Sequence, residues 1–214
     1  PANDMVVSKL GFPTEWAARY QSPCRMSRDR WYDFPTLHYG TRDMADSGIR
    51  IERLGRNLGA RVHGADLSKP LSDADFAAIQ NALAEHEMLL FRDQDIEPSA
   101  QLAFGRRFGP PSVHPFSPNL AEMPELIVLD NHQGNPPRLT DIWHSDETFR
   151  AEPPMATILR ATITPELGGD TMFASMSAAF DGLADQLQHF LSGLEAVHDF
   201  KPFRGLLASD ADGH

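Results

Sequence analysis

The clearest hydrophobic pattern in the chain follows Ser72. Phe76, Ile79 and Leu83 recur at intervals of three and four residues, so they share one face of a helix. Ser72 stands before this stripe as an N-cap residue, and Asp75 three positions later fits the same helix start. The pattern predicts an amphipathic helix that packs its apolar face against a sheet.

Short apolar runs elsewhere predict the strands of that sheet. Residues 88–91 form a continuous apolar run that a polar turn ends, and residues 51–54 and 60–63 flank a turn bounded by glycines. The same reasoning predicts strands at residues 126–129, 155–164 and 171–174. Strands interspersed with helices indicate an α+β domain.

Two more helices are predicted from caps and spacing. One has Pro98 in its first turn and ends at Phe108, where a Gly-Pro-Pro sequence stops it. The other carries apolar residues from Leu187 to Leu194 and is broken at Gly193 or just beyond. Both alternate with predicted strands, which suits a sheet with helices packed outside it.

The first 48 residues lack such a pattern. Between Pro1 and Gly48, aromatic and basic residues are scattered without a sustained helical or strand period. We therefore divide the chain into an N-terminal extension of unclear role, residues 1–48, and a domain over residues 49–214. A lid or an oligomerisation arm is the alternative for the extension, since chain termini vary in this way.

The composition narrows the class of protein. The formal net charge of −11 and the pI near 5.2 argue against nucleic acid or an anionic membrane as the partner. The single cysteine, Cys24, cannot form an internal disulfide, and no apolar run approaches the roughly 20 residues of a membrane span. We expect a cytoplasmic protein, and a homo-oligomer is left open.

Residues 143–149, Trp-His-Ser-Asp-Glu-Thr-Phe, carry the candidate chemistry. At the end of a strand, positions i and i+2 share a face, so His144 and Asp146 can meet on one metal ion. An imidazole and a carboxylate suit iron(II), whereas structural zinc usually takes thiolates. The triplet alone is weak evidence, because this composition predicts about 0.8 His-x-Asp triplets by chance. The competing interpretation is that His144 caps a turn and Asp146 pairs with Arg150.

Several further stretches, collinear with this motif, have the character of one enzyme family. They are residues 64–72, 90–94, 107–109, 114–115, 127–130, 135–137, 168–171 and 198–200. With these stretches the chain resembles the TauD/TfdA family of Fe(II)- and 2-oxoglutarate-dependent dioxygenases, whose best-known member hydroxylates taurine. Collinear agreement of this kind is more specific than any one motif.

The resemblance implies a fold and a metal site. The fold is a double-stranded β-helix, a jelly-roll core with flanking helices. His144 and Asp146 would bind Fe(II), with 2-oxoglutarate and O2 as co-substrates. The hydroxyl of Thr171 would donate to the distal carboxylate of 2-oxoglutarate. The alternative for Thr171 is a β-branched strand residue after a glycine turn.

The resemblance also implies a pocket for a small anionic substrate. His114 takes the place of the substrate-contacting histidine of the taurine enzyme, and a plain loop histidine is the alternative. Ser117 and Thr140 stand where that enzyme has a tyrosine and an asparagine. Loss of both groups favours another sulfonate, an alkyl sulfate or a carboxylate-bearing substrate over taurine.

Two parts of the family's site are missing from the sequence. The family has a second histidine ligand far downstream, followed by an arginine that binds 2-oxoglutarate. The downstream histidines here are His189, His198 and His214, and none suits the ligand: His189 lies in a helical pattern, His198 comes too early and His214 is the last residue. We expect a C-terminally truncated piece of a longer enzyme, incomplete in its sheet and inactive or poorly folded alone.

Two other classes of protein stay open. A non-catalytic or degenerate jelly-roll module would hold a metal structurally or not at all. A metal-dependent hydrolase or isomerase on a related barrel would use a bound water in place of oxygen. Iron-dependent formation of succinate and dependence on O2 distinguish both classes from a dioxygenase.

Overall fold

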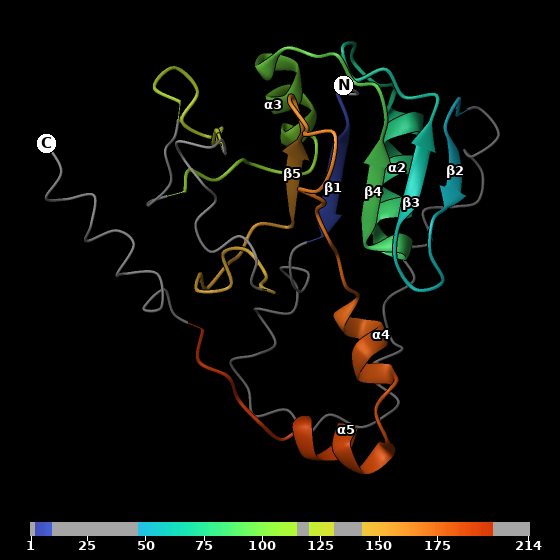
Figure 1. The fold of residues 1–214 in the computed structure, drawn as a ribbon, viewed down its shortest axis with the longest axis vertical. Coiled ribbons are helices and arrows are strands. Elements are labelled where there is room, and N and C mark those ends of the chain that lie inside the picture. Colours follow the sequence, from blue (N-terminus) through green and yellow to red (C-terminus); the bar gives the residue numbers. More distant parts are fainter. Residues whose placement is uncertain (1–2, 10–46, 115–119, 131–142, 199–214) are drawn as a thin grey trace, which may run out of the picture.

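One mixed sheet organises the structure, a computed structural model that describes residues 3–9, 47–114, 120–130 and 143–198 (Figure 1). Its strands are β1 (Met5–Lys9), β2 (Arg50–Arg53), β3 (Ala60–His63), β4 (Met88–Phe91) and β5 (Ala156–Arg160). They lie in the order β2-β3-β4-β1-β5. β3 and β4 are parallel, and the other neighbouring pairs are antiparallel. The strands predicted near residues 51–54, 60–63, 88–91 and 155–164 are thereby confirmed, the last over a shorter range.

The helices begin and end close to where the sequence predicts. α2 (Asp73–His86) begins at Ser72, whose hydroxyl accepts a hydrogen bond of 3.1 Å from the backbone N–H of Asp75. It ends at Glu87, which has a left-handed φ of 62°. α3 (Pro98–Arg106) has its proline in the first turn. α4 (Met176–Asp181) was not anticipated from the sequence, while α5 (Asp185–Leu191) is the predicted last helix.

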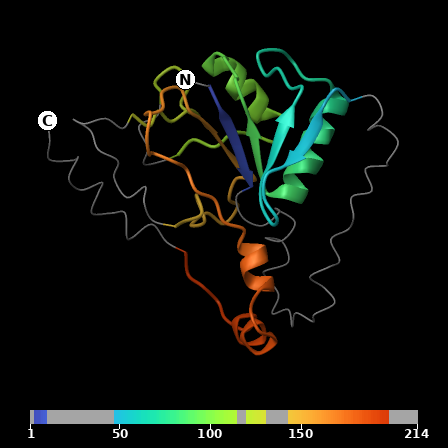
Figure 2. The same cartoon turned by 45° about the vertical axis from the view of Figure 1, so that its right-hand side comes forward.

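The core lies between one face of the sheet and the helices α2 and α3 (Figure 1, Figure 2). Alternate residues of a strand point to opposite faces, so Leu89 and Phe91 face this core while Leu90 faces the other side. Leu89 and Phe91 have no exposed surface. The Phe104 ring of α3 meets Phe91 edge to face with 5.8 Å between ring centroids. Helix packing against this one face therefore leaves the opposite face of the sheet to the segments that follow α3.

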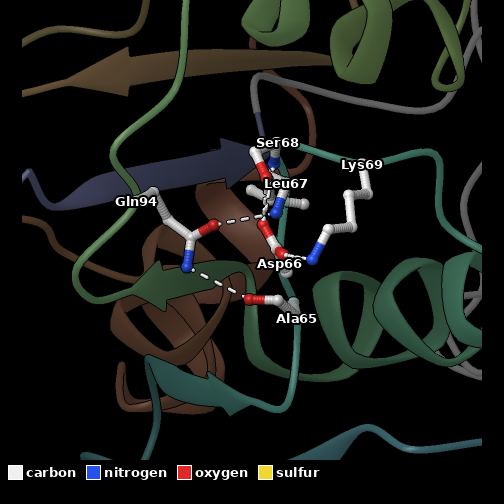
Figure 3. A network of polar contacts seen from close by, with 6 residues as sticks. All are labelled: Ala65, Asp66, Leu67, Ser68, Lys69 and Gln94. Carbon is white, nitrogen blue, oxygen red and sulfur yellow. Dashed lines mark hydrogen bonds and ion pairs between the residues drawn. The ribbon is translucent and has the colours of Figure 1, made fainter.

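A buried glutamine connects two of the family-like stretches (Figure 3). The side chain of Gln94 follows β4 and is 8% exposed. Its carbonyl accepts a 3.0 Å hydrogen bond from the backbone N–H of Leu67, and its amide donates to the carbonyl of Ala65 at 3.1 Å. Residues 64–72 and 90–94 are thus joined in space by hydrogen bonds that a buried amide requires.

The N-terminal strand differs from the pattern-free extension predicted for residues 1–48. β1 lies between β4 and β5, and the side chains of Met5 and Val7 are fully buried on the core face. The prediction was wrong for these residues because five residues are too few to establish a period, and the partners of β1 lie some 80 to 150 positions away. The division of the chain at residue 48 stays a prediction.

The second sheet of a jelly roll is not among the residues that the structure describes. The strands predicted at residues 126–129 and 171–174 are not formed: the first segment has a single β-bridge residue, Ile127, and the second is irregular. Leu129 is 63% exposed and Met172 is 72% exposed, so their apolar runs are not covered as those of β1 and β4 are. An apolar run becomes a strand only where partner strands and a covering layer exist.

Within these described ranges, no helix combines the length and the apolar character that a membrane crossing requires.

Candidate functional site

His144 and Asp146 approach each other as the motif predicts. The Nε2 atom of His144 lies 3.2 Å from Oδ1 of Asp146, and the two side chains are 52% and 39% exposed. The backbone around them is irregular and turns at Glu147, which has a left-handed φ of 50°. The predicted strand end is therefore wrong, because a turn rather than a pleat brings the two groups together. Their convergence on a metal ion stays a prediction.

Thr157 of β5 fixes the Asp146 carboxylate from the other side. Its hydroxyl donates a 2.9 Å hydrogen bond to Oδ2 of Asp146. The two oxygens of this carboxylate therefore have different surroundings, with Oδ2 held by the strand and Oδ1 beside the imidazole. The sequence alone could not identify Thr157, since its neighbour in space is eleven positions away and no motif includes it.

Arg150 does not pair with Asp146, so that part of the competing interpretation is wrong. The guanidinium of Arg150 forms an ion pair with Glu147 and donates to the carbonyl of Val113 at 3.1 Å. The Glu147 carboxylate also accepts a hydrogen bond of 3.2 Å from the hydroxyl of Ser112. This ion pair, 10% exposed at Glu147 and 29% at Arg150, ties residues 112–114 to the turn that carries the metal-ligand candidates.

His114 is brought to the same turn. Its ring meets the Phe149 ring edge to face with 6.3 Å between centroids. Phe149 in turn has the Arg150 guanidinium 5.7 Å from its ring centroid. The structure thus places the predicted substrate-contacting histidine and the His144 to Asp146 pair on two segments that contact each other.

Thr171 is not brought into this cluster by any described hydrogen bond. It follows Gly168 and Gly169, whose φ values of 74° and 73° are left-handed and suit glycine, and it is exposed. The strand predicted to carry it is absent from the described residues. Its role toward 2-oxoglutarate stays a prediction. Ser117 and Thr140 lie outside the described residues.

A third metal ligand is not found in the part of the chain that the structure describes. Over these residues, no group of three or more histidine, cysteine, aspartate or glutamate side chains is placed to hold a metal ion. His189 lies on α5 and His198 follows it, while His214 is outside the described residues. That neither His189 nor His198 completes the site stays a prediction.

The two candidate ligands nevertheless fit one ion. Two donor atoms that each lie about 2.1 Å from a divalent ion, at a right angle to each other, are about 3 Å apart. The observed separation of 3.2 Å between Nε2 and Oδ1 is close to that spacing. An imidazole and a carboxylate are two of the three donors of the two-histidine, one-carboxylate site that binds non-haem iron.

Two surface cavities of the described residues lie away from this turn. One of about 290 Å³ is lined by residues at the start of α3, such as Asp95 and Ser99. The other, of about 410 Å³, lies between the turn after β2 and the start of α4. Neither is lined by His114, His144 or Asp146.

Comparison with known proteins identifies the class. The chain belongs to the Taurine catabolism dioxygenase TauD, TfdA family, which it matches over residues 50–213. The His144 to Asp146 pair lies inside the matched range, and β1 lies outside it.

Individual relatives sharpen the likeness. The chain is 35% identical over 165 residues to an alpha-ketoglutarate-dependent sulfate ester dioxygenase of Pseudomonas putida, an alignment that covers 77% of this chain and 54% of that protein. It is 34% identical to an alkylsulfatase of Acinetobacter baylyi, over 70% of this chain and 47% of that one. A solved taurine dioxygenase of Burkholderia xenovorans superposes with a TM-score of 0.61 at 31% identity, over 68% of this chain and 51% of that structure. The chain therefore spans about half the length of the relatives it matches, and it superposes on part of a family member's structure.

Proposed function

We propose that the complete protein is an iron(II)- and 2-oxoglutarate-dependent dioxygenase that oxidises a small alkyl sulfate or sulfonate. The observation that carries the proposal is the convergence of His144 Nε2 and Asp146 Oδ1 at 3.2 Å on a turn that also contacts the His114 segment. The sulfate ester dioxygenase and alkylsulfatase among the relatives support this class of substrate.

Each site residue then has a defined task. His144 and Asp146 would hold iron(II), which when bound supplies the activation of O2 with 2-oxoglutarate as the reducing co-substrate. Thr171 would donate its hydroxyl to the distal carboxylate of 2-oxoglutarate, and its exposure leaves that hydroxyl accessible. His114 would donate an N–H to the anionic sulfur group, with Ser117 and Thr140 lining the same pocket.

The substrate class decides the products. Oxygen from O2 is divided between the hydroxylated substrate carbon and succinate, while 2-oxoglutarate loses carbon dioxide. A hydroxyl placed on the carbon that bears a sulfate group collapses to an aldehyde with release of sulfate. The same step next to a sulfonate releases sulfite. Measuring which sulfur anion appears therefore distinguishes the two substrates without knowledge of the carbon chain.

The test uses a protein that carries this chain together with the region corresponding to the other half of its relatives. We expect iron(II) and 2-oxoglutarate to give succinate in the presence of an alkyl sulfate or an alkanesulfonate, with one equivalent of sulfate or sulfite. His144→Ala and Asp146→Ala should abolish succinate formation, while His189→Ala on α5 serves as a histidine control and should leave it unchanged. Absence of iron-dependent succinate would rule out the proposal. The 214-residue chain alone should form none, because among the residues that the structure describes only His144 and Asp146 are placed as ligands.

A non-catalytic metal-binding jelly-roll module is the second candidate. It is favoured by the absence of a third ligand among the residues that the structure describes. Such a module would bind a divalent ion through His144 and Asp146 yet form no succinate in the extended protein. We also propose a cytoplasmic location and a small-molecule partner, on the acidic composition and the single cysteine.

A further inference from the structure

The position of Thr157 in the sheet is the starting point. Ala156 and Ile158, its neighbours on β5, pack against the core that α2 and α3 cover. Because successive strand residues point to opposite faces, the Thr157 side chain lies on the opposite face of the sheet. The turn that carries Asp146 meets the sheet there, through the 2.9 Å hydrogen bond from the Thr157 hydroxyl to Oδ2.

The strand that holds Thr157 depends on the N-terminal segment. β5 is an edge strand of the sheet, and its neighbour is β1. In that antiparallel pair Ser8 stands opposite Thr157, and the fully buried Val7 stands opposite Ile158. The segment Met5–Lys9 therefore sets where the Thr157 hydroxyl lies, although it precedes the residues matched to the family.

This hydrogen bond selects one arrangement of the carboxylate. A free aspartate side chain rotates, and either oxygen can then point toward a ligand. With Oδ2 engaged as the acceptor of a hydroxyl, Oδ1 is the oxygen that stands beside Nε2 of His144. Partners that orient a metal ligand in this way commonly change metal affinity by about 10- to 100-fold when they are removed.

We propose that Thr157 is a positioning residue of the metal site, which orients Asp146 for binding a divalent ion together with His144. This role of Thr157 rests on the proposed function, because it requires the metal ion that a dioxygenase of this kind would bind. Thr157 itself touches neither metal nor substrate in this role. It acts through the carboxylate of Asp146.

The first experiment uses the extended protein that tests the proposed function, titrates it with Co²⁺ and follows the visible absorption of the bound ion. Thr157→Val removes the hydroxyl and keeps the β-branched shape, so the strand should be retained. We expect its dissociation constant for Co²⁺ to rise about tenfold. Thr157→Ser keeps the hydroxyl and should restore most of the affinity. Thr164→Val makes the same chemical change at an exposed threonine beyond β5 and should leave the affinity unchanged. Equal affinities for Thr157→Val and the unsubstituted chain would overturn the proposal.

A second readout needs no metal. Thr157→Val and Asp146→Ala are combined in a double-mutant cycle on thermal unfolding. If the hydroxyl and the carboxylate are bonded, the two losses of melting temperature are not additive, because either change alone removes the same interaction. Additive losses would show that the bond is absent and would overturn the proposal. If the cycle is non-additive but the extended protein binds no Co²⁺, the hydrogen bond exists, the proposed metal function is wrong, and the proposed role of Thr157 is wrong with it.

Discussion

Two regions of this chain have similar apolar content and opposite surroundings. In the region formed by the five strands with α2 and α3, large side chains such as Met5, Leu89 and Phe91 have no exposed surface. In the region that follows β5, Leu167 is 92% exposed and Val197 is 94% exposed. Apolar residues are present in both, so composition does not explain the difference. What differs is whether a second layer lies against them.

The comparison shows that the packed core and the candidate metal ligands belong to different parts of the described structure. The sheet with its two helices has two layers and a common core, which is the minimum a stable unit requires. The exposed region has helices α4 and α5 without a buried side chain on either. Exposed apolar surface on this scale marks a place where further structure or a partner packs. The metal-ligand candidates lie at the boundary, on an irregular turn that β5 supports through Thr157.

The position of this turn, between the packed sheet and the exposed region, is suitable for a ligand-binding site. Binding residues are commonly carried by loops that a rigid scaffold positions. Here β5 and the Glu147–Arg150 ion pair provide the support, while His144 and Asp146 keep half-exposed side chains that a ligand can reach. A third metal ligand from outside the described residues could then join the site while the strands of the sheet keep their positions.

The sharpest test of the comparison removes one phenylalanine from each region. Phe91→Ala should lower the free energy of unfolding by about 3 to 5 kcal/mol, since the ring is fully buried and meets Phe104 edge to face. Phe190→Ala on α5, where the ring is 62% exposed, should change it little. Urea unfolding followed by circular dichroism measures both. Equal losses in the two variants would mean that the second region is packed in solution.

A methionine pair tests the N-terminal strand in the same way. Met5→Ala should cost about 2 to 5 kcal/mol, because this side chain is fully buried between the sheet and its helices. Met172→Ala, at a side chain 72% exposed in an irregular segment, is the matched control and should cost almost nothing. Chemical denaturation gives both values. A neutral Met5→Ala would return residues 5–9 to the status of an extension.

The sequence predicted best where local chemistry decides the structure. Ser72 and Asp75 correctly predicted the start of α2, and the apolar run at residues 88–91 correctly predicted β4. Both signals depend on interactions over only a few residues. β1 could not be predicted in this way, because its two buried side chains depend on strands far along the chain.

The candidate site was predictable only in part. His144 and Asp146 are two positions apart, but this spacing alone was weak evidence that they meet, and the family resemblance was needed to expect it. Thr157 and the Glu147 to Ser112 hydrogen bond connect separate segments, and a single sequence carries no sign of them. Residues 126–129 show an error of a different kind. Their apolar run was interpreted as a buried strand, but the structure leaves the side chains of residues 127–129 exposed.

The smallest expected effect concerns a surface carboxylate in the well-packed region. Hydrogen bonds from Lys69 and then from Ser68 lower the pKa of Asp66 to about 2, from 3.8 (Figure 3). The folded pKa is below the unfolded one, so any stabilisation is present above about pH 4 and is lost as the pH falls toward 2. Both side chains are largely exposed, so solvent screening keeps that stabilisation slight.

Lys69→Gln should therefore raise the pKa of Asp66 toward 3.8 without reaching it, because the Ser68 hydroxyl and N–H still donate to Oδ1. The melting temperature at neutral pH should barely change. The carbon-13 shift of the Asp66 carboxyl, followed from pH 6 to pH 1.5, measures the pKa. As the control, Arg53→Gln removes a cation from β2 and should leave the pKa of Asp66 unchanged. An Asp66 that titrates near 3.8 in the unsubstituted chain would mean that the Lys69 contact does not persist in water, and that even in the well-packed region order is confined to the buried side chains.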